Sequence, residues 1–166
     1  MHGANLRADL LFNIRTGVRY HLRRQQFFDR WHRLTGVLSL VLSSAAVWAM
    51  LKEFRMAEYS AATVALLQAI DLVFETRKHA DLHNSLRQRY VVLEPEVAGV
   101  DEVSYEEYKK LKSDIARIEI DEPPLKSILL AISQNEAAEV SSFSEEDYPS
   151  SYTRVGWFKA LFANIL

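Results

Sequence analysis

Apolar and polar residues divide the first half of the chain into a basic helix followed by two apolar runs. In the first segment, apolar residues recur at every fourth position, at Leu10, Ile14, Val18 and Leu22. This spacing, with arginines on the other faces, predicts an amphipathic helix over residues 5–31. The first apolar run, residues 34–51, is eighteen residues without a charge, and the second covers residues 57–74.

The length of these two runs suggests a membrane hairpin. A helix of about 20 apolar residues crosses the hydrocarbon core of a bilayer. Positive charge lies outside the pair of runs, and positive flanks stay cytoplasmic. We therefore expect spans at 34–51 and 57–74, both termini in the cytoplasm and the turn at 52–60 outside. The residues expected at the membrane interface are Arg23, Arg24, Arg30, Trp31, Arg33, Trp48, Arg77 and Lys78.

The rest of the chain predicts further helices and almost no sheet. A seam of apolar residues with heptad-like spacing comprises Leu82, Leu86, Tyr90, Leu93 and Val97, which favours an oligomer contact. Ser104 and Glu107 form a capping box that starts a helix with Ile115 and Ile118 inward. Pro123 and Pro124 are expected to end it and to begin a helix that buries Leu125, Ile128, Leu129 and Ile132.

The predicted fold is all-α. It is a two-span transmembrane hairpin with long cytoplasmic helices and a small helical C-terminal lobe. We expect one domain over residues 1–98 and an acidic lobe with an apolar tail over residues 99–166. Trp157, Phe158, Leu161, Phe162, Ile165 and Leu166 make up that tail. It either lies in the membrane interface or docks on a groove formed by helices.

Charge is distributed unevenly behind a net charge of −2. Residues 1–33 sum to +5, whereas residues 91–150 sum to −10. The basic segment could bind nucleic acid, but its position beside an apolar run favours a membrane surface. The acidic lobe leaves room for a basic protein partner. With no cysteine in the chain, thiol catalysis and cysteine metal sites are excluded.

Polar residues within the two runs are the candidates for a functional site. Ser39, Ser43, Gln68 and Asp71 are expected to line a pore, because polar groups at membrane depth usually face a bundle interior or a water-filled path. Alternatively, Asp71 lies near the cytoplasmic interface and pairs with a neighbour such as Arg77 or an N-terminal arginine. The small residues Ala61, Ala65 and Ala69 allow close helix packing, within one hairpin or between copies.

No catalytic motif is present, so we expect no enzyme activity, cofactor or metal site. Phosphate-binding glycine loops, nucleophile elbows and zinc-protease motifs are absent. The carboxylates occur as adjacent EE and DE pairs, which are typical of solvated surfaces. Glu75, His79 and His83 share a helix face by their spacing of four, which favours a pH response over metal binding.

The layout of residues 15–98 resembles a known family. A basic, aromatic-rich helix (RYHLRRQQFFDRWHRL) precedes the hairpin, and a helix with His83, Leu86, Tyr90, Leu93 and Glu96 follows it. This arrangement is similar to the SLATT domain, a two-transmembrane effector of bacterial conflict systems. The resemblance implies a homo-oligomeric pore in the bacterial inner membrane that acts in anti-phage defence.

The leading functional hypothesis is therefore an oligomeric, membrane-permeabilising effector whose partners are the lipid bilayer and further copies of itself. Two alternatives stay open. In one, the hairpin only anchors an adaptor that recruits a partner through its acidic lobe. In the other, residues 34–74 form the core of a water-soluble helical bundle.

Overall fold

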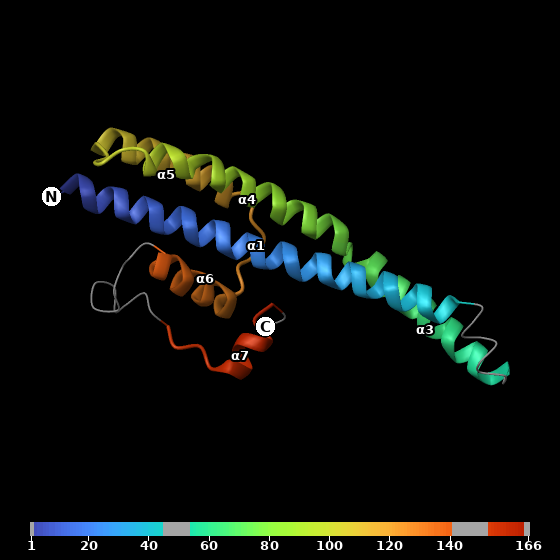
Figure 1. The fold of residues 1–166 in the computed structure, drawn as a ribbon. Coiled ribbons are helices and arrows are strands. Elements are labelled where there is room, and N and C mark those ends of the chain that lie inside the picture. The colour runs from blue at the N-terminus through green and yellow to red at the C-terminus, as the bar shows by residue number, and fades with distance from the viewer. Residues whose placement is uncertain (1, 45–53, 141–152, 165–166) are drawn as a thin grey trace. The chain divides into compact units, whose positions relative to one another are not determined.

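The chain is all-α in the computed structural model, as the sequence predicts (Figure 1). The structure describes residues 2–44, 54–140 and 153–164, and no strand occurs among them. The helices are α1 (His2–Ser43), α3 (Phe54–Phe74), α4 (Thr76–Ala98), α5 (Tyr105–Glu119), α6 (Ser127–Val140) and α7 (Trp157–Leu161).

The helices form two compact units. We call residues 1–24 and 83–166 the core unit, and residues 25–82 the hairpin unit. The predicted boundary, after residue 98, is not where the two units divide. The reason is that the first half of α1 packs with the later helices. Arg15 in α1, for example, pairs with Glu94 in α4 at 2.9 Å.

The core unit buries one face of each of its long helices. The fully buried large side chains include Leu10, Ile14, Tyr20, Leu86, Val97 and Leu129. Ile115 and Ile118 of α5 are each 4% exposed, which confirms their predicted inward position. Leu125 is 46% exposed, so the prediction that it is buried was wrong. It precedes α6 instead of lying in it.

The helix ends follow local chemistry in most places. The capping box of Ser104 and Glu107 is present at the start of α5, as predicted. The Glu107 carboxylate accepts hydrogen bonds from the Ser104 hydroxyl and backbone, and these lower its pKa. Pro123 and Pro124 lie in the connector and do not start α6, which begins at Ser127. α3 and α4 are separated at Glu75, whose φ is 42°.

Gly17 allows α1 to approach α4 closely. A Cβ atom there would lie 2.8 Å from Cζ and Cε2 of Tyr90, whose hydroxyl is held by Glu122. Replacing Gly17 by Ala should destabilise the protein by about 1–2 kcal/mol, because overpacking outweighs the gain in helix propensity.

Gly36 is the matched control for this substitution in the same helix. A Cβ atom on Gly36 would meet nothing within 4 Å, so Gly36→Ala should stabilise the protein by up to about 1 kcal/mol. Thermal unfolding followed by circular dichroism measures both variants. A stabilising effect of Gly17→Ala would contradict the close packing against Tyr90.

The hairpin unit pairs the second half of α1 with α3. Along α1, the residues turned toward α3 are polar, since Thr35 is 3% and Ser39 8% exposed. The outward faces are apolar, and their exposed large side chains are Leu34, Val37, Leu38, Leu40 and Val41 on α1 and Tyr59, Leu66, Leu72, Val73 and Phe74 on α3. The polarity of this unit is therefore reversed relative to a water-soluble core.

Among the described residues, no helix combines the length and the apolar character needed to cross a bilayer. The predicted first span, 34–51, is described only as far as Ser44. Trp48, expected at the membrane interface, also falls outside the described residues.

Candidate functional site

Two clusters of polar side chains stand out, one in each unit. In the hairpin unit, the Gln68 amide donates to Ser39 Oγ at 2.7 Å across the two helices. His32 Nδ1 lies 3.0 Å from a carboxylate oxygen of Asp71, and the Thr76 hydroxyl donates to the other oxygen. The polar groups of the hairpin thus satisfy one another.

The structure brings together three of the four predicted pore-lining residues. Ser39, Gln68 and Asp71 all contribute to contacts between α1 and α3, although Gln68, like Ser43, is an exposed residue. Asp71 does pair with a neighbour, but that neighbour is His32 of α1, and Arg77 pairs instead with Asp81 at 3.6 Å. The small residues Ala61, Ala65 and Ala69 lie on an exposed face of α3.

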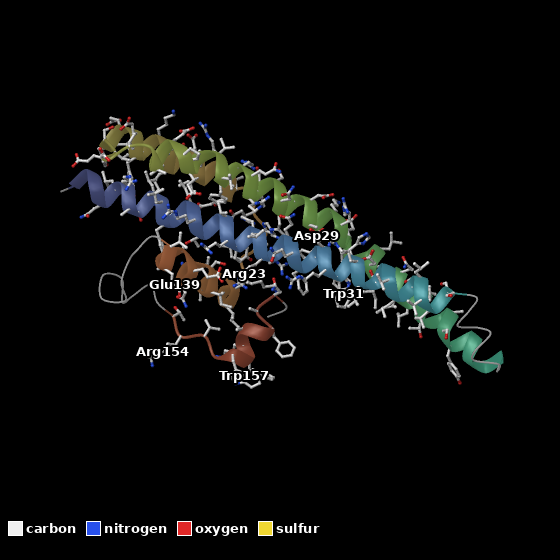
Figure 2. The ribbon with its side chains drawn as sticks, in the orientation of Figure 1. Arg23, Asp29, Trp31, Glu139, Arg154 and Trp157 are labelled. Carbon is white, nitrogen blue, oxygen red and sulfur yellow. The ribbon has the colours of Figure 1, made fainter. Side chains whose placement is uncertain are left out.

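The predicted interface residues are divided between the units. Arg23 pairs with Glu136, and the Arg24 guanidinium donates to the backbone oxygen of Asn164 at 2.7 Å, both within the core unit. Burial lowers the pKa of Arg24. In the hairpin unit, the exposed members of this set are Arg30, Trp31 (Figure 2), Arg33, Arg77 and Lys78.

The apolar seam predicted as an oligomer contact lies against the chain's own helices. Leu86, Tyr90 and Val97 are at most 3% exposed, and Leu82 and Leu93 are half-buried. Leu86, Tyr90, Leu93 and Val97 help to form the core unit, whereas Leu82 belongs to the hairpin unit. A role for them between copies stays a prediction.

The second cluster is a buried network in the core unit that joins α1, α4 and the connector after α5. His21 Nδ1 and His83 Nδ1 are 2.9 Å apart, and both imidazoles are at most 1% exposed. His21 Nε2 lies 3.0 Å from Glu122 Oε1. The Tyr90 hydroxyl donates to the same oxygen at 2.7 Å.

The geometry assigns the protons of this network. For two Nδ1 atoms to share one hydrogen bond, one ring must donate and the other accept. Both contacts are satisfied if His83 donates from Nδ1 to His21 and His21 donates from Nε2 to Glu122.

Two pKa shifts follow from these contacts. Burial by itself raises the pKa of Glu122, but hydrogen bonds from His21 and Tyr90 outweigh it, and the net pKa is lowered. For Tyr90, burial and the hydrogen bond to the Glu122 carboxylate both raise the pKa far above its ordinary value. The folded protein therefore favours a charged Glu122 and a neutral Tyr90.

Tyr90→Phe should reveal this preference at alkaline pH. Below pH 10, its ordinary pKa, Tyr90 contributes its full stability, and the variant should be less stable by about 1.5–3 kcal/mol. As the pH rises above 10, the unfolded tyrosine ionises while the folded one does not, so this advantage shrinks by about 1.4 kcal/mol per pH unit.

Urea unfolding of the wild type and Tyr90→Phe between pH 7 and 11.5 measures the difference. Tyr105→Phe is the control, because that side chain is 63% exposed and its substitution removes no buried hydrogen bond. If the difference in unfolding free energy between the wild type and Tyr90→Phe stays constant up to pH 11.5, the pKa of Tyr90 is not raised in the folded protein.

Sequence reasoning missed His21 and Glu122. His21 stands among arginines and follows no periodic pattern, and Glu122 belongs to a DE pair that was assigned to solvent. Glu122 precedes Pro123, and the residue before a proline is restricted to extended conformations. This position was a signal that Glu122 does not continue the preceding helix.

The C-terminal tail is docked by its last described residues. Ala163 is 1% exposed and packs with Tyr20 and Leu129. The aromatic side chains of this segment point away, since Trp157 is 79% and Phe158 61% exposed (Figure 2). Ile165 and Leu166 lie outside the described residues.

The three residues considered for a pH response or a metal make separate contacts. Glu75 pairs with Lys78, His79 stacks on Phe28 with ring centres 5.2 Å apart, and His83 contacts His21. Throughout the part of the chain that the structure describes, no group of three or more His, Cys, Asp or Glu side chains is arranged to hold a metal ion.

Comparison of the chain with protein-family models, with curated proteins and with solved structures finds no match. The resemblance to the SLATT domain thus stays a prediction from residues 15–98.

Proposed function

We propose that this protein is a non-enzymatic membrane effector whose hairpin unit inserts into the bacterial inner membrane and permeabilises it as a homo-oligomer. The observation that carries the proposal is the reversed polarity of the hairpin unit. Leu40 is 74% and Val73 77% exposed, while Thr35 and Ser39 are buried. Lipid is a solvent in which an apolar exterior and a polar seam are both stable.

The polar seam supports the proposal because its groups are paired within the hairpin. An unsatisfied polar group is costly in hydrocarbon, and polar side chains between membrane helices therefore bond to one another. Ser39 with Gln68, and Asp71 with His32 and Thr76, meet this requirement. A polar path then forms where several copies bring their seams around one axis.

An exposed stripe of alanines on α3 supports assembly from several copies. Ala61, Ala65 and Ala69 recur every fourth residue and are exposed. Small residues at this spacing let helix backbones approach closely in lipid, where no hydrophobic drive brings helices together. Because one hairpin cannot enclose a lumen, the proposed activity requires this contact between copies.

The exposed basic residues near the ends of the hairpin support its orientation. Arg30, Arg33, Arg77 and Lys78 are all exposed in the hairpin unit. Positive residues next to a span favour the cytoplasmic side. In this topology both termini are cytoplasmic, and residues 52–60 face the other side.

Internal ion pairs weigh against the adaptor alternative. Two acidic residues of the lobe pair with basic residues that precede it in the chain: Asp121 pairs with Arg89, and Glu136 with Arg23. The water-soluble alternative would leave the apolar outer faces of both hairpin helices in contact with water.

A vesicle assay tests the proposal. The purified full chain is added to phosphatidylethanolamine–phosphatidylglycerol vesicles that contain a self-quenched dye, and flotation is measured in parallel. We expect the protein to float with the vesicles and to release the dye. A chain that stays monomeric and monodisperse in detergent-free buffer, without floating, would refute membrane insertion.

Matched variants on α3 separate insertion from assembly. Ala65→Leu blocks the alanine stripe and should abolish dye release while flotation persists. Thr63→Leu adds bulk to a different exposed face of the same helix and should preserve both. Equal dye release by the two variants would exclude the stripe as the contact between copies.

A further inference from the structure

A cavity of about 200 Å³ lies in the core unit beside the buried histidine network. Its walls come from α1, α4, the end of α5, the following connector and α6. The volume is below the range of about 300–1,000 Å³ that is typical of sites for drug-sized ligands. It is therefore suited to a small metabolite.

The charges of the cavity wall have one sign. Glu119 and Glu122 contribute carboxylates, and none of the lining residues, all from the described part of the chain, is Lys or Arg. The Glu122 carboxylate receives hydrogen bonds at Oε1, and a carboxylate can accept about four in all.

The Thr16 hydroxyl is a second, independent observation. Thr16 is 8% exposed and lines the cavity, and its Oγ1 is buried without a hydrogen-bond partner. A buried polar atom without a partner costs stability, so such an atom at a cavity wall indicates a site for a ligand with a hydrogen-bond donor.

Aromatic and apolar groups complete the wall. Tyr20 and Tyr90 line the cavity, and tyrosine rings attract organic cations through their faces. The Tyr20 oxygen accepts a hydrogen bond from the backbone N–H of Lys126 at 2.9 Å, which fixes that ring. Leu130 provides an apolar surface for an alkyl chain.

We propose that this cavity binds a small organic cation, an alkylamine or alkylguanidine. Glu119 and Glu122 neutralise the charged head, Thr16 Oγ1 accepts one of its N–H groups, and the tyrosine rings enclose it. The site joins α1, α4 and α6, so its occupant stabilises the core unit. This inference is independent of the proposed membrane function, and its test contains no vesicles.

Isothermal titration calorimetry of the full chain in a non-ionic detergent at constant ionic strength tests the site. The probes are agmatine and putrescine, with butyrate as the anionic control and 1-butanol as the neutral one. We expect saturable binding of at least one cation and of neither control. Absence of saturable binding by both cations, or equal binding of the controls, would overturn the proposal.

Variants locate the binding. Glu119→Gln changes an exposed residue and leaves folding unaffected, and Thr16→Val preserves the shape of the side chain. Each should weaken cation binding at least about tenfold, because Glu119→Gln removes a charge opposite the cation and Thr16→Val removes a hydrogen-bond acceptor. Glu106→Gln, on the exposed first turn of α5, should leave the affinity unchanged. Wild-type affinity in Glu119→Gln and Thr16→Val would place binding elsewhere and refute the assignment.

Discussion

Leu40→Lys combined with Leu66→Lys should release the protein from membranes and abolish dye release. The two leucines lie near the middle of the proposed spans, on the outer faces of α1 and α3, where they are 74% and 62% exposed. A lysine near the centre of a span costs about 3 kcal/mol, so the pair costs about 6 kcal/mol. This corresponds to a loss of about four orders of magnitude in membrane partition.

The same substitutions cost little in the fold itself. Because both leucine side chains are exposed, lysine replaces no intramolecular packing, and surface substitutions usually stay within about 0.5 kcal/mol. Flotation with vesicles measures the partition, and circular dichroism confirms that the helices persist. A protein that partitions equally well with both lysines would show that the outer faces of the hairpin are not in contact with lipid.

A control pair uses exposed apolar residues of the core unit. Leu125 is 46% and Val140 56% exposed, and Leu125→Lys with Val140→Lys introduces the same two charges outside the proposed spans. This variant should float as the wild type does. Loss of flotation in both double variants would mean that charge alone, irrespective of position, controls partition.

Periodicity was sufficient to predict helices such as α5, which buries Leu111, Ile115 and Ile118 along one face. The capping box at Ser104 and the inward positions of Ile115 and Ile118 depend on residues within four positions of one another. Such local patterns predict a helix without knowledge of the distant residues that pack against it. Leu125 was assigned wrongly because the two prolines before it belong to a connector and not to a first helical turn.

The sequence alone could not show which negatively charged group each arginine contacts. A basic amphipathic helix is attracted equally by lipid phosphates and by carboxylates. Of the arginines assigned to the membrane interface, Arg23 pairs with Glu136 of α6, 113 residues away, whereas Arg30 and Arg33 are exposed. The same limit applies to the seam of α4, because a heptad-like stripe has the same pattern whether another copy or the chain's own helices cover it.

The buried network of His21, His83 and Glu122 could not be predicted from sequence, for a different reason. Its contacts join His21 to His83 over 62 positions and to Glu122 over 101 positions. A single histidine or glutamate carries no local pattern that names such a partner. The polar seam of the hairpin was partly accessible, because Ser39 and Gln68 interrupt apolar runs in which any polar side chain requires an explanation.

Glu122→Ala should cause the largest loss of stability among the single substitutions considered, about 3–5 kcal/mol. It removes the acceptor shared by His21 Nε2 and the Tyr90 hydroxyl, and both donors are left buried without that partner. Leaving a buried donor without its partner has this cost because the remaining group stays desolvated. Glu119→Ala, an exposed change near the end of α5, should stay within about 0.5 kcal/mol.

Glu122→Gln separates the charge of this group from its hydrogen bonds. The pKa of Glu122 is lowered in the folded protein, so its ionised form contributes stability above its ordinary pKa of 4.5, and this contribution is lost as the pH falls through the folded value. The wild type should therefore exceed Glu122→Gln in stability above pH 4.5, and the difference should narrow in more acidic solution. Urea unfolding between pH 3 and 7 measures it. A difference that widens toward acid would mean that Glu122 is protonated in the fold, and that the network is held together by hydrogen bonds between neutral groups.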